Sequence, residues 1–248
     1  MPSRPDAATT ARSAAELTDP VPAPTPAVVL FDVNETLSDM APMATRFEDV
    51  GASPALAATW FASLLRDGFA LTAAGARAPF AMIGAELLRT LLPADELDRS
   101  LDAAVEHILS GFGALPVHPD VPEGLRALAA TGRRLVTLSN GSASVAEGLL
   151  ARAALTSYVE RLLSVEDAGA WKPAAAAYTY AAAQCGVQTQ EMVLVAVHPW
   201  DVDGAGRAGL RTAWLNRGGM SYPAHFRRPD LEVPSLLDLA DRLGSGLD

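Results

Sequence analysis

The sequence of 248 residues contains a single cysteine, Cys185, and few basic residues. One cysteine excludes an intramolecular disulfide and a zinc site built from several thiolates. Lysine and arginine number 19 against 29 aspartates and glutamates, which leaves a formal net charge of −10 at pH 7. A nucleic-acid surface needs a basic stripe that displaces counterions, so this balance argues against a nucleic-acid partner. A small anionic substrate stays open, because a pocket can hold local positive charge that the total conceals.

Long apolar runs are also missing. No segment approaches the ~20 consecutive apolar residues of a transmembrane helix, so we expect no membrane partner. The N-terminal segment is rich in alanine, proline and threonine and lacks the continuous apolar core of a signal peptide. We therefore expect residues 1–26 to be a disordered lead-in and the protein to be cytoplasmic.

Half of the residues are hydrophobic, which is enough for a buried core. Short apolar, β-branched runs predict strands buried on both faces of a parallel sheet, at residues 27–31, 135–138, 162–165, 192–197 and 212–215. Helical segments alternate with these runs, at residues 123–130, 144–152, 174–185, 204–208 and 234–243. This alternation predicts an α/β fold with a Rossmann-like, doubly wound parallel sheet.

The segment from residue 42 to residue 118 shows helical periodicity and no strand signal. Pro54, Pro79 and Pro93 separate its helical stretches. We therefore expect residues 42–118 to form a helical cap inserted after the first strand. The α/β core then comprises residues 27–41 and 119–248.

Polar residues gather where the predicted strands end, which is where ligands bind in open α/β sheets. In chain order these residues are Asp32, Ser139 and Asn140, Lys172, and the segment from His198 to Asp201. Any one of them alone is more commonly a cap, a turn residue or a solvated charge. Their recurrence at successive strand ends predicts one cleft that holds two carboxylates, a hydroxyl group and an ammonium group.

These residues resemble the motifs of the haloacid dehalogenase (HAD) superfamily, in the right order and over nearly the whole chain from residue 27 to about residue 243. The matching segments are Phe31-Asp32-x-x-x-Thr36-Leu37, Leu138-Ser139-Asn140-Gly141, Lys172-Pro173, and Asp201-x-x-Gly204-Ala205 with Ala208-Gly209. The resemblance implies a Rossmann-like core with a mobile cap. It also implies covalent catalysis by the aspartate of the first motif.

Two positions separate this sequence from the phosphatases of the superfamily. Phosphatases carry a second aspartate two residues after the nucleophile, which protonates the leaving alkoxide, and Asn34 stands there. They also carry an acidic Mg²⁺ ligand four residues before the last-motif aspartate, where this sequence has Val197. A halide leaves without protonation or a metal. The resemblance therefore favours the metal-free type II branch, the (S)-2-haloacid dehalogenases, which use no cofactor and convert 2-haloalkanoic acids to 2-hydroxy acids and halide.

The resemblance to this branch also implies a role for each catalytic residue. Asp32 displaces the halide from the α-carbon, Thr36 orients Asp32, Lys172 pairs with Asp32, and Asp201 positions the water that hydrolyses the ester. The residues expected to contact the substrate are Asn34, Phe61, Ser139, Asn140, Tyr178, His198 and Trp200. Two interpretations stay open for Tyr178: its side chain lines the site, or it packs in the core. His198 is interpreted either as a base or as a hydrogen-bonding residue at a strand end.

Some positions depart from the best-known members of the branch. Those members have Tyr and Gly where this sequence has Asn34 and Glu35, and a halide-binding Arg where it has Phe61. Arg46, Arg66 and Asn34 are the candidates to replace that arginine.

The sequence leaves two other functions open. A HAD-type phosphatase with altered acid and metal positions would release phosphate with Mg²⁺, and a non-catalytic HAD-fold protein would bind a ligand without turnover. The presence of Asp32, Thr36, Lys172 and Asp201 favours an enzyme over a binding protein. A homodimer is a further expectation, because dimers are usual in the branch that the sequence resembles.

Overall fold

The computed structural model describes residues 26–245 of the chain. The predicted disordered segment, residues 1–26, lies outside this range apart from Pro26. Within the described range, no helix combines the length and apolar character needed to cross a membrane.

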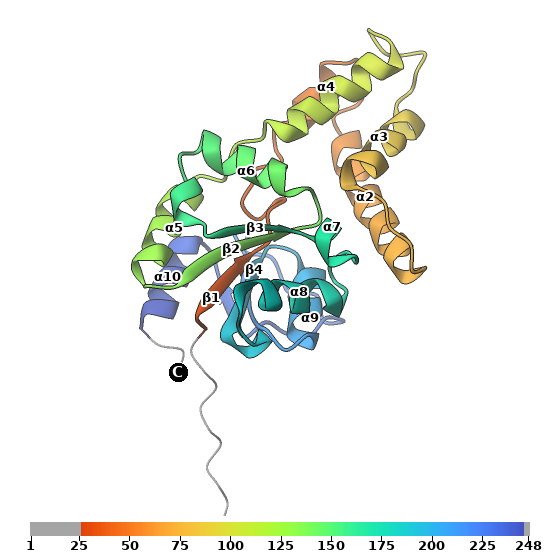
Figure 1. The fold of residues 1–248 in the computed structure, drawn as a ribbon. Coiled ribbons are helices and arrows are strands. Elements are labelled where there is room, and N and C mark those ends of the chain that lie inside the picture. Colours follow the sequence, from red (N-terminus) through yellow and green to blue (C-terminus); the bar gives the residue numbers. More distant parts are fainter. Residues whose placement is uncertain (1–25, 246–248) are drawn as a thin grey trace, which may run out of the picture.

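The described residues contain one six-stranded sheet whose strands all run parallel, in the order β3-β2-β1-β4-β5-β6 (Figure 1). The strands are β1 (Val28–Phe31), β2 (Arg134–Ser139), β3 (Arg161–Ser164), β4 (Met192–Ala196), β5 (Arg211–Leu215) and β6 (Leu231–Val233). The direction in which successive strands are added to the sheet reverses between the adjacent strands β1 and β4, and a polar segment follows each of these two strands. Such a switch point is where open α/β sheets bind their ligands.

Both faces of the sheet are covered, which explains the continuous apolar runs of its strands. Val28 and Leu30 of β1 pack in one hydrophobic cluster, and Val29 and Phe31 pack in the other. The first cluster includes residues of α8 (Ala175–Cys185) and α9 (Pro199–Arg207). The second includes residues of α5 (Val121–Ala130), α6 (Ala143–Arg152) and α10 (Leu236–Gly244). The predicted doubly wound α/β fold is confirmed.

Four helices lie between β1 and β2 ahead of α5, and Figure 1 shows α2, α3 and α4 apart from the sheet. They are α1 (Met43–Glu48), α2 (Leu56–Ala73), α3 (Phe80–Leu91) and α4 (Leu101–Gly113). The chain enters and leaves this helical cap through two paired segments. The N–H of Asp39 donates to the carbonyl of Pro116 at 2.8 Å, and the N–H of His118 donates to the carbonyl of Leu37 at 2.9 Å. The predicted insertion of helices after the first strand is confirmed, and its boundaries at residues 42 and 118 stay a prediction.

Short elements complete the described chain: η1 (Thr156–Tyr158), α7 (Val165–Ala168) and η2 (Thr189–Glu191). Two sequence-based expectations were wrong in detail. The helix expected from residue 204 begins at Pro199, because proline suits the first helical position, where no N–H partner is needed. Strand β6 was not expected, because its three residues at the sheet edge are too few to show a pattern.

Candidate active site

Asp32 follows β1 directly, and its carboxylate is the centre of the site. Its side chain is almost fully buried, and its N–H donates to the carbonyl of Val195 at 3.1 Å. The Thr36 hydroxyl donates to Asp32 Oδ2 at 2.6 Å and accepts a hydrogen bond from the N–H of Val197 at 3.1 Å. The turn after β1 is thereby tied to the end of the neighbouring strand β4. The predicted pairing of Thr36 with Asp32 is present in the structure.

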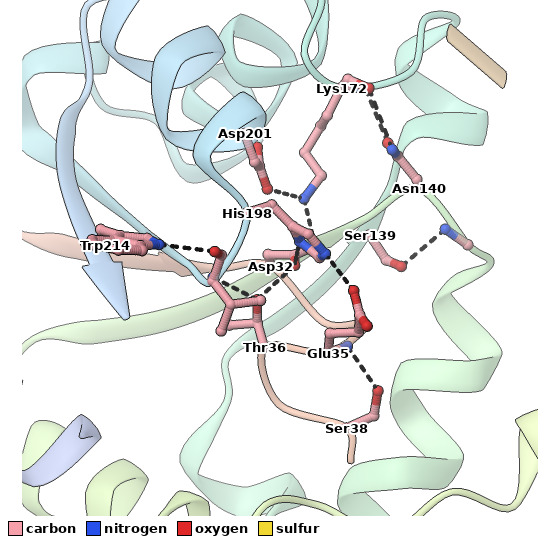
Figure 2. A network of polar contacts seen from close by, with 12 residues as sticks. Asp32, Glu35, Thr36, Ser38, Ser139, Asn140, Lys172, His198, Asp201 and Trp214 are labelled. Carbon is pink, nitrogen blue, oxygen red and sulfur yellow. Dashed lines mark hydrogen bonds and ion pairs between the residues drawn. The ribbon is translucent and has the colours of Figure 1, made fainter. Parts of the chain in front are cut away.

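One side of Asp32 faces a set of buried polar side chains that we call the lysine flank: Lys172, Asp201 and Tyr178. The Lys172 ammonium lies 2.7 Å from Asp32 Oδ1 and 2.6 Å from Asp201 Oδ2 (Figure 2). The Tyr178 hydroxyl donates to Asp201 Oδ1 at 2.6 Å. The side chains of Lys172 and Asp201 are both 0% exposed, so the ion pairs are shielded from water. Lys172 is also the only lysine of the sequence.

Lys172 reaches the site from the loop between α7 and α8 and not directly from a strand end. The Asn140 side chain holds this loop, since its Oδ1 accepts from the N–H of Lys172 at 2.9 Å and its Nδ2 donates to the Lys172 carbonyl at 3.3 Å. Gly204 of α9 packs against the next residue. A Cβ at position 204 would lie 2.5 Å from Cβ of Pro173, so only glycine allows this approach. The glycine of the last motif therefore helps to position the lysine.

The other side of Asp32 faces a second set, which we call the histidine flank: His198 and Glu35. Figure 2 shows the His198 ring between the two carboxylates, with Nδ1 at 3.1 Å from Asp32 Oδ2 and Nε2 at 2.7 Å from Glu35 Oε2. Carboxylates only accept hydrogen bonds, so both ring nitrogens carry hydrogen and the ring is an imidazolium. The ring of Trp200 stacks on it at a centroid distance of 4.9 Å. His198 is therefore a second cation in contact with Asp32.

Glu35 is the one residue of this constellation that had no predicted role. Its backbone is left-handed, with φ of 61°, a conformation that is unfavourable for any residue with a Cβ. Its N–H donates to Ser38 Oγ at 3.3 Å, and its carbonyl lies 2.9 Å from His118 Nε2. One feature of the sequence could have indicated a role for Glu35: it is an acidic residue inside the first motif, at a position where the best-known members of the branch have glycine.

The neighbouring charges decide the protonation states of the site. Burial favours the neutral form of Asp32, but Lys172 and His198 outweigh it and hold the pKa of that carboxyl well below its usual range. Burial likewise opposes the charge of Lys172, yet its two carboxylate partners raise its pKa. Burial would lower the pKa of His198, but hydrogen bonds to Asp32 and Glu35 raise it from 6.5 to about 9. At neutral pH, Asp32 is a carboxylate held between two cations.

The remaining predicted substrate contacts lie around this centre. Ser139 Oγ accepts from the N–H of Gly141 at 2.9 Å. Asn34 is buried, and a Cβ added at Gly141 would lie 3.9 Å from its amide nitrogen and 3.8 Å from the ring of Phe80 in α3. Phe61 of α2 is buried and lines a cavity of about 450 Å³ that Glu35 also borders. The structure therefore places Ser139, Asn34 and the cap residue Phe80 around Gly141, while the amide of Asn140 and the hydroxyl of Tyr178 are engaged with Lys172 and Asp201.

Neither candidate arginine replaces the missing halide-binding arginine in this conformation. The Arg66 side chain is 67% exposed and pairs with Asp67 at 2.8 Å. Arg46 packs over the backbone of Gly111 in α4. Within the described chain, neither side chain forms a hydrogen bond or ion pair with a site residue.

The described residues contain no group of three or more histidine, cysteine, aspartate or glutamate side chains placed to hold a metal ion. The cation that lies between the carboxylates of Asp32 and Asp201 is the ammonium group of Lys172. Fold and site together define a class of capped α/β proteins that hold a buried carboxylate, paired with a lysine, at the tip of the first strand.

Comparison with known proteins narrows this class. A family model described as haloacid dehalogenase-like hydrolase matches residues 26–209. The (S)-2-haloacid dehalogenase 4A of Burkholderia cepacia is 29% identical over 85% of this chain and 91% of its own length. Haloacetate dehalogenase H-2 of Moraxella sp. (strain B) is 35% identical, and that match spans 47% of this chain and 52% of the relative. A crystal structure of a dehalogenase with an intermediate complex superposes with a TM-score of 0.82 at 28% identity, covering 90% of this chain and 99% of that one.

The family model covers most of the sequence, so the chain belongs to the haloacid dehalogenase-like hydrolases. The predicted membership of the HAD superfamily and its dehalogenase branch is confirmed by these matches.

Proposed function

We propose that the protein is a hydrolytic dehalogenase of small (S)-2-haloalkanoic acids, which it converts to 2-hydroxy acids and halide without a metal or cofactor. The observation that carries this proposal is the Asp32 carboxylate, which is buried and kept ionised by Lys172 at 2.7 Å. A carboxylate stripped of water is a competent nucleophile toward carbon, provided that the leaving group needs no proton. The relatives named as (S)-2-haloacid dehalogenases support this choice of substrate.

In the first half of the reaction, one oxygen of Asp32 attacks the α-carbon of the substrate. The carbon–halogen bond breaks, the halide leaves with the bonding pair, and the configuration at the carbon inverts. Lys172 offsets the repulsion between Asp32, Asp201 and the incoming substrate carboxylate. Thr36 keeps the nucleophile in place through its short hydrogen bond to Oδ2.

In the second half, water attacks the Asp32 ester and the 2-hydroxy acid is released. Asp201 accepts a proton from that water. Burial raises the pKa of Asp201; Lys172 opposes this rise and Asp32 adds to it, so Asp201 is more basic than an ordinary aspartate. Its hydrogen bond from Tyr178 fixes the orientation of the carboxylate.

Substrate recognition is assigned to the groups between the strand ends and the cap. Ser139 and Asn34 offer polar atoms to the substrate carboxylate or the leaving halide. Phe61 and Trp200 supply apolar walls, and Trp200 contacts the ring of Phe69 in α2 at a centroid distance of 4.9 Å. A homodimer and a cytoplasmic location stay predictions.

The proposal is tested by halide release from chloroacetate, bromoacetate and (S)-2-chloropropionate, with and without EDTA. We expect release that EDTA leaves unchanged and that D32N lowers by about 10⁴-fold or more, because the nucleophile is gone. Circular dichroism of D32N controls for folding. EDTA-sensitive release of phosphate from phosphate esters, or binding of haloacids without turnover, would contradict the proposal.

A single-turnover reaction in ¹⁸O water tests the ester intermediate. With enzyme in excess, the label should enter the Asp32 carboxylate while the 2-hydroxy acid stays unlabelled. Label that appears in the product during the first turnover would instead indicate direct attack of water on the substrate carbon.

A further inference from the structure

We propose that His198 is a catalytic residue of the second half-reaction. Its Nδ1–H and the Thr36 hydroxyl form an oxyanion hole for Asp32 Oδ2 while the ester is hydrolysed, and Glu35 positions the ring. This inference rests on the proposed function, since it concerns the hydrolysis of the Asp32 ester. It goes beyond that proposal by assigning the two oxygens of Asp32 to different tasks.

The two oxygens of Asp32 have different surroundings. Oδ2 lies within hydrogen-bond distance of two donors, Thr36 Oγ1 at 2.6 Å and His198 Nδ1 at 3.1 Å, whereas Oδ1 accepts from Lys172 at 2.7 Å. An ester oxygen is a poor acceptor, so attack through Oδ2 would leave two buried donors without a partner. Attack through Oδ1 makes Oδ2 the carbonyl oxygen of the ester and keeps both donors in use. The geometry therefore assigns nucleophilic attack to Oδ1 and the later oxyanion to Oδ2.

Both donors are held in place before the reaction begins. The N–H of Val197 donates to Thr36 Oγ1 at 3.1 Å, which leaves the Thr36 hydroxyl hydrogen for Asp32. The carbonyl of Val197 accepts from the indole N–H of Trp214 in β5 at 2.9 Å (Figure 2). The residue before His198 is thus fixed at both backbone groups. A preorganised donor of this kind stabilises developing charge without reorganisation during the step.

Glu35 keeps His198 a donor after the ester has formed. Alkylation removes the charge of Asp32, and an imidazole without that partner would lose a proton more easily. The Glu35 carboxylate, 2.7 Å from Nε2, retains the second N–H and with it the cationic ring. Beyond these two carboxylates, the titratable and charged groups near His198 are Lys172 behind Asp32 and, around an adjoining cavity of about 420 Å³, Asp39, His118 and Arg217.

The atoms and charges of the step balance. The water oxygen bonds to Cγ of Asp32, Asp201 takes one of its protons, and the electron pair of the carbonyl bond moves onto Oδ2. When this pair returns, the bond between Cγ and Oδ1 breaks and the departing alkoxide takes the proton from Asp201. Asp32 is left as a carboxylic acid, which ionises and releases one proton per halide. During the charged interval, Oδ2 accepts from Thr36 and His198.

Two substitutions of His198 separate its two ring nitrogens. The amide nitrogen of asparagine reaches the place of Nδ1, so H198N keeps a donor to Oδ2 and loses the contact with Glu35. The amide of the longer glutamine reaches the place of Nε2, so H198Q keeps the contact with Glu35 and loses the donor to Oδ2. The pair is matched in polarity, and both variants lose the ring.

The experiment mixes each variant with chloroacetate and follows halide release by rapid quench and the bound carboxymethyl group by intact-protein mass spectrometry. For H198Q we expect a first halide release within about threefold of wild type, ester hydrolysis slowed by about 10²–10³-fold, and accumulation of the adduct. H198N should hydrolyse the ester within about tenfold of wild type. A burst of halide in H198Q would itself show that this variant is folded.

A variant of Glu35 tests its positioning role through the pH profile. In E35Q, the rate of ester hydrolysis should fall between about pH 6.5 and about pH 8.5, where wild type should stay level, because the ring loses its proton earlier. The first halide release in E35Q should not change over this range. A level profile in E35Q would show that Glu35 does not act through His198.

The outcomes separate this inference from the function on which it rests. Equal hydrolysis rates in H198N and H198Q, or an H198Q variant whose first halide release is the slowed step, would overturn the oxyanion role alone. A wild-type protein that releases no halide and forms no adduct would overturn the proposed function and this role together.

Discussion

The two flanks of Asp32 are built differently. On the lysine flank, Lys172 and Asp201 are 0% exposed and every charge has a buried partner. On the histidine flank, the Glu35 side chain is 42% exposed, and its backbone adopts a left-handed conformation. The charges of the lysine flank are therefore shielded from solvent, whereas His198 on the histidine flank, with a pKa of about 9, loses its charge as the pH rises.

This difference suits two separate steps of the proposed reaction. In the proposed reaction, the buried ion pair with Lys172 keeps Asp32 charged and desolvated for the displacement of halide. In the proposed oxyanion role, the partly exposed Glu35 keeps His198 protonated while Asp32 carries no charge as an ester. Glu35, one of the positions at which this sequence departs from the best-known members of the branch, lies on this second flank in contact with His198.

Removing the buried cation should have the largest effect. K172M leaves two buried carboxylates facing each other, and it should lower the free energy of unfolding by about 3–5 kcal/mol. It should also raise the pKa of Asp32 and nearly abolish halide release. Urea denaturation and a halide assay measure both effects. In the control R134M, the half-exposed pair with Glu160 is lost, and we expect a change below about 1 kcal/mol.

The pH dependence of stability should report the histidine flank. The pKa of His198 rises from 6.5 in the unfolded chain to about 9 in the folded protein. Its stabilisation, about 3 kcal/mol, is therefore complete below pH 6.5 and is lost as the pH rises toward 9. Urea denaturation of wild type and H198N at several pH values isolates this contribution. A difference between the two proteins that does not change with pH would mean that His198 is neutral.

Loss of one hydroxyl group should weaken the lysine flank to a lesser degree. Y178F removes the hydrogen bond to Asp201 Oδ1, in which both groups are buried and one is charged. We expect the free energy of unfolding to fall by about 1.5–3 kcal/mol. Chemical denaturation provides the measurement, and Y222F is the control. The Tyr222 hydroxyl bonds backbone carbonyls nearer the surface, so a larger loss in Y222F would contradict the ranking.

An added methyl group behind Lys172 should have the smallest effect. In G204A the new Cβ meets Pro173 at 2.5 Å, so the loop that carries Lys172 must shift. Overpacking of this kind costs about 1–3 kcal/mol, and halide release should fall with it. The matched control is G113A, where nothing lies within 4 Å of the new Cβ and helix α4 should gain slightly. Equal Tm values for the two variants would show that the approach of Pro173 is not tight.

Much of the fold was predictable from short-range patterns. Strands β1, β2, β4 and β5 are buried on both faces, so each is a mostly apolar run. The short edge strand β6, with an exposed Glu232 at its centre, carries no such signal. The start of α9 at Pro199 was not predicted, because a proline in a sequence is compatible both with a turn and with the first position of a helix.

The site was predictable where its partners are close in sequence or belong to a motif. Thr36 lies four residues after Asp32 in the same turn, so their contact follows from local geometry. The roles expected of Lys172 and Asp201 were implied by the resemblance of their motifs to the family. The hydrogen bonds that hold these two residues, from Asn140 to the backbone of Lys172 and from Tyr178 to Asp201, were not predictable. They depend on which loops pack together in the folded protein.

The sequence by itself determined the class of fold, the order of the motifs and the loss of the acidic groups that a phosphatase needs. Only the tertiary structure decided that Glu35 and His198, separated by 163 positions, lie 2.7 Å apart. The reason is the pairing of β1 with β4, which places the polar segments that follow these parallel strands at the same edge of the sheet. Hydrophobic burial of the strands thus brings together two charged side chains that no local pattern connects.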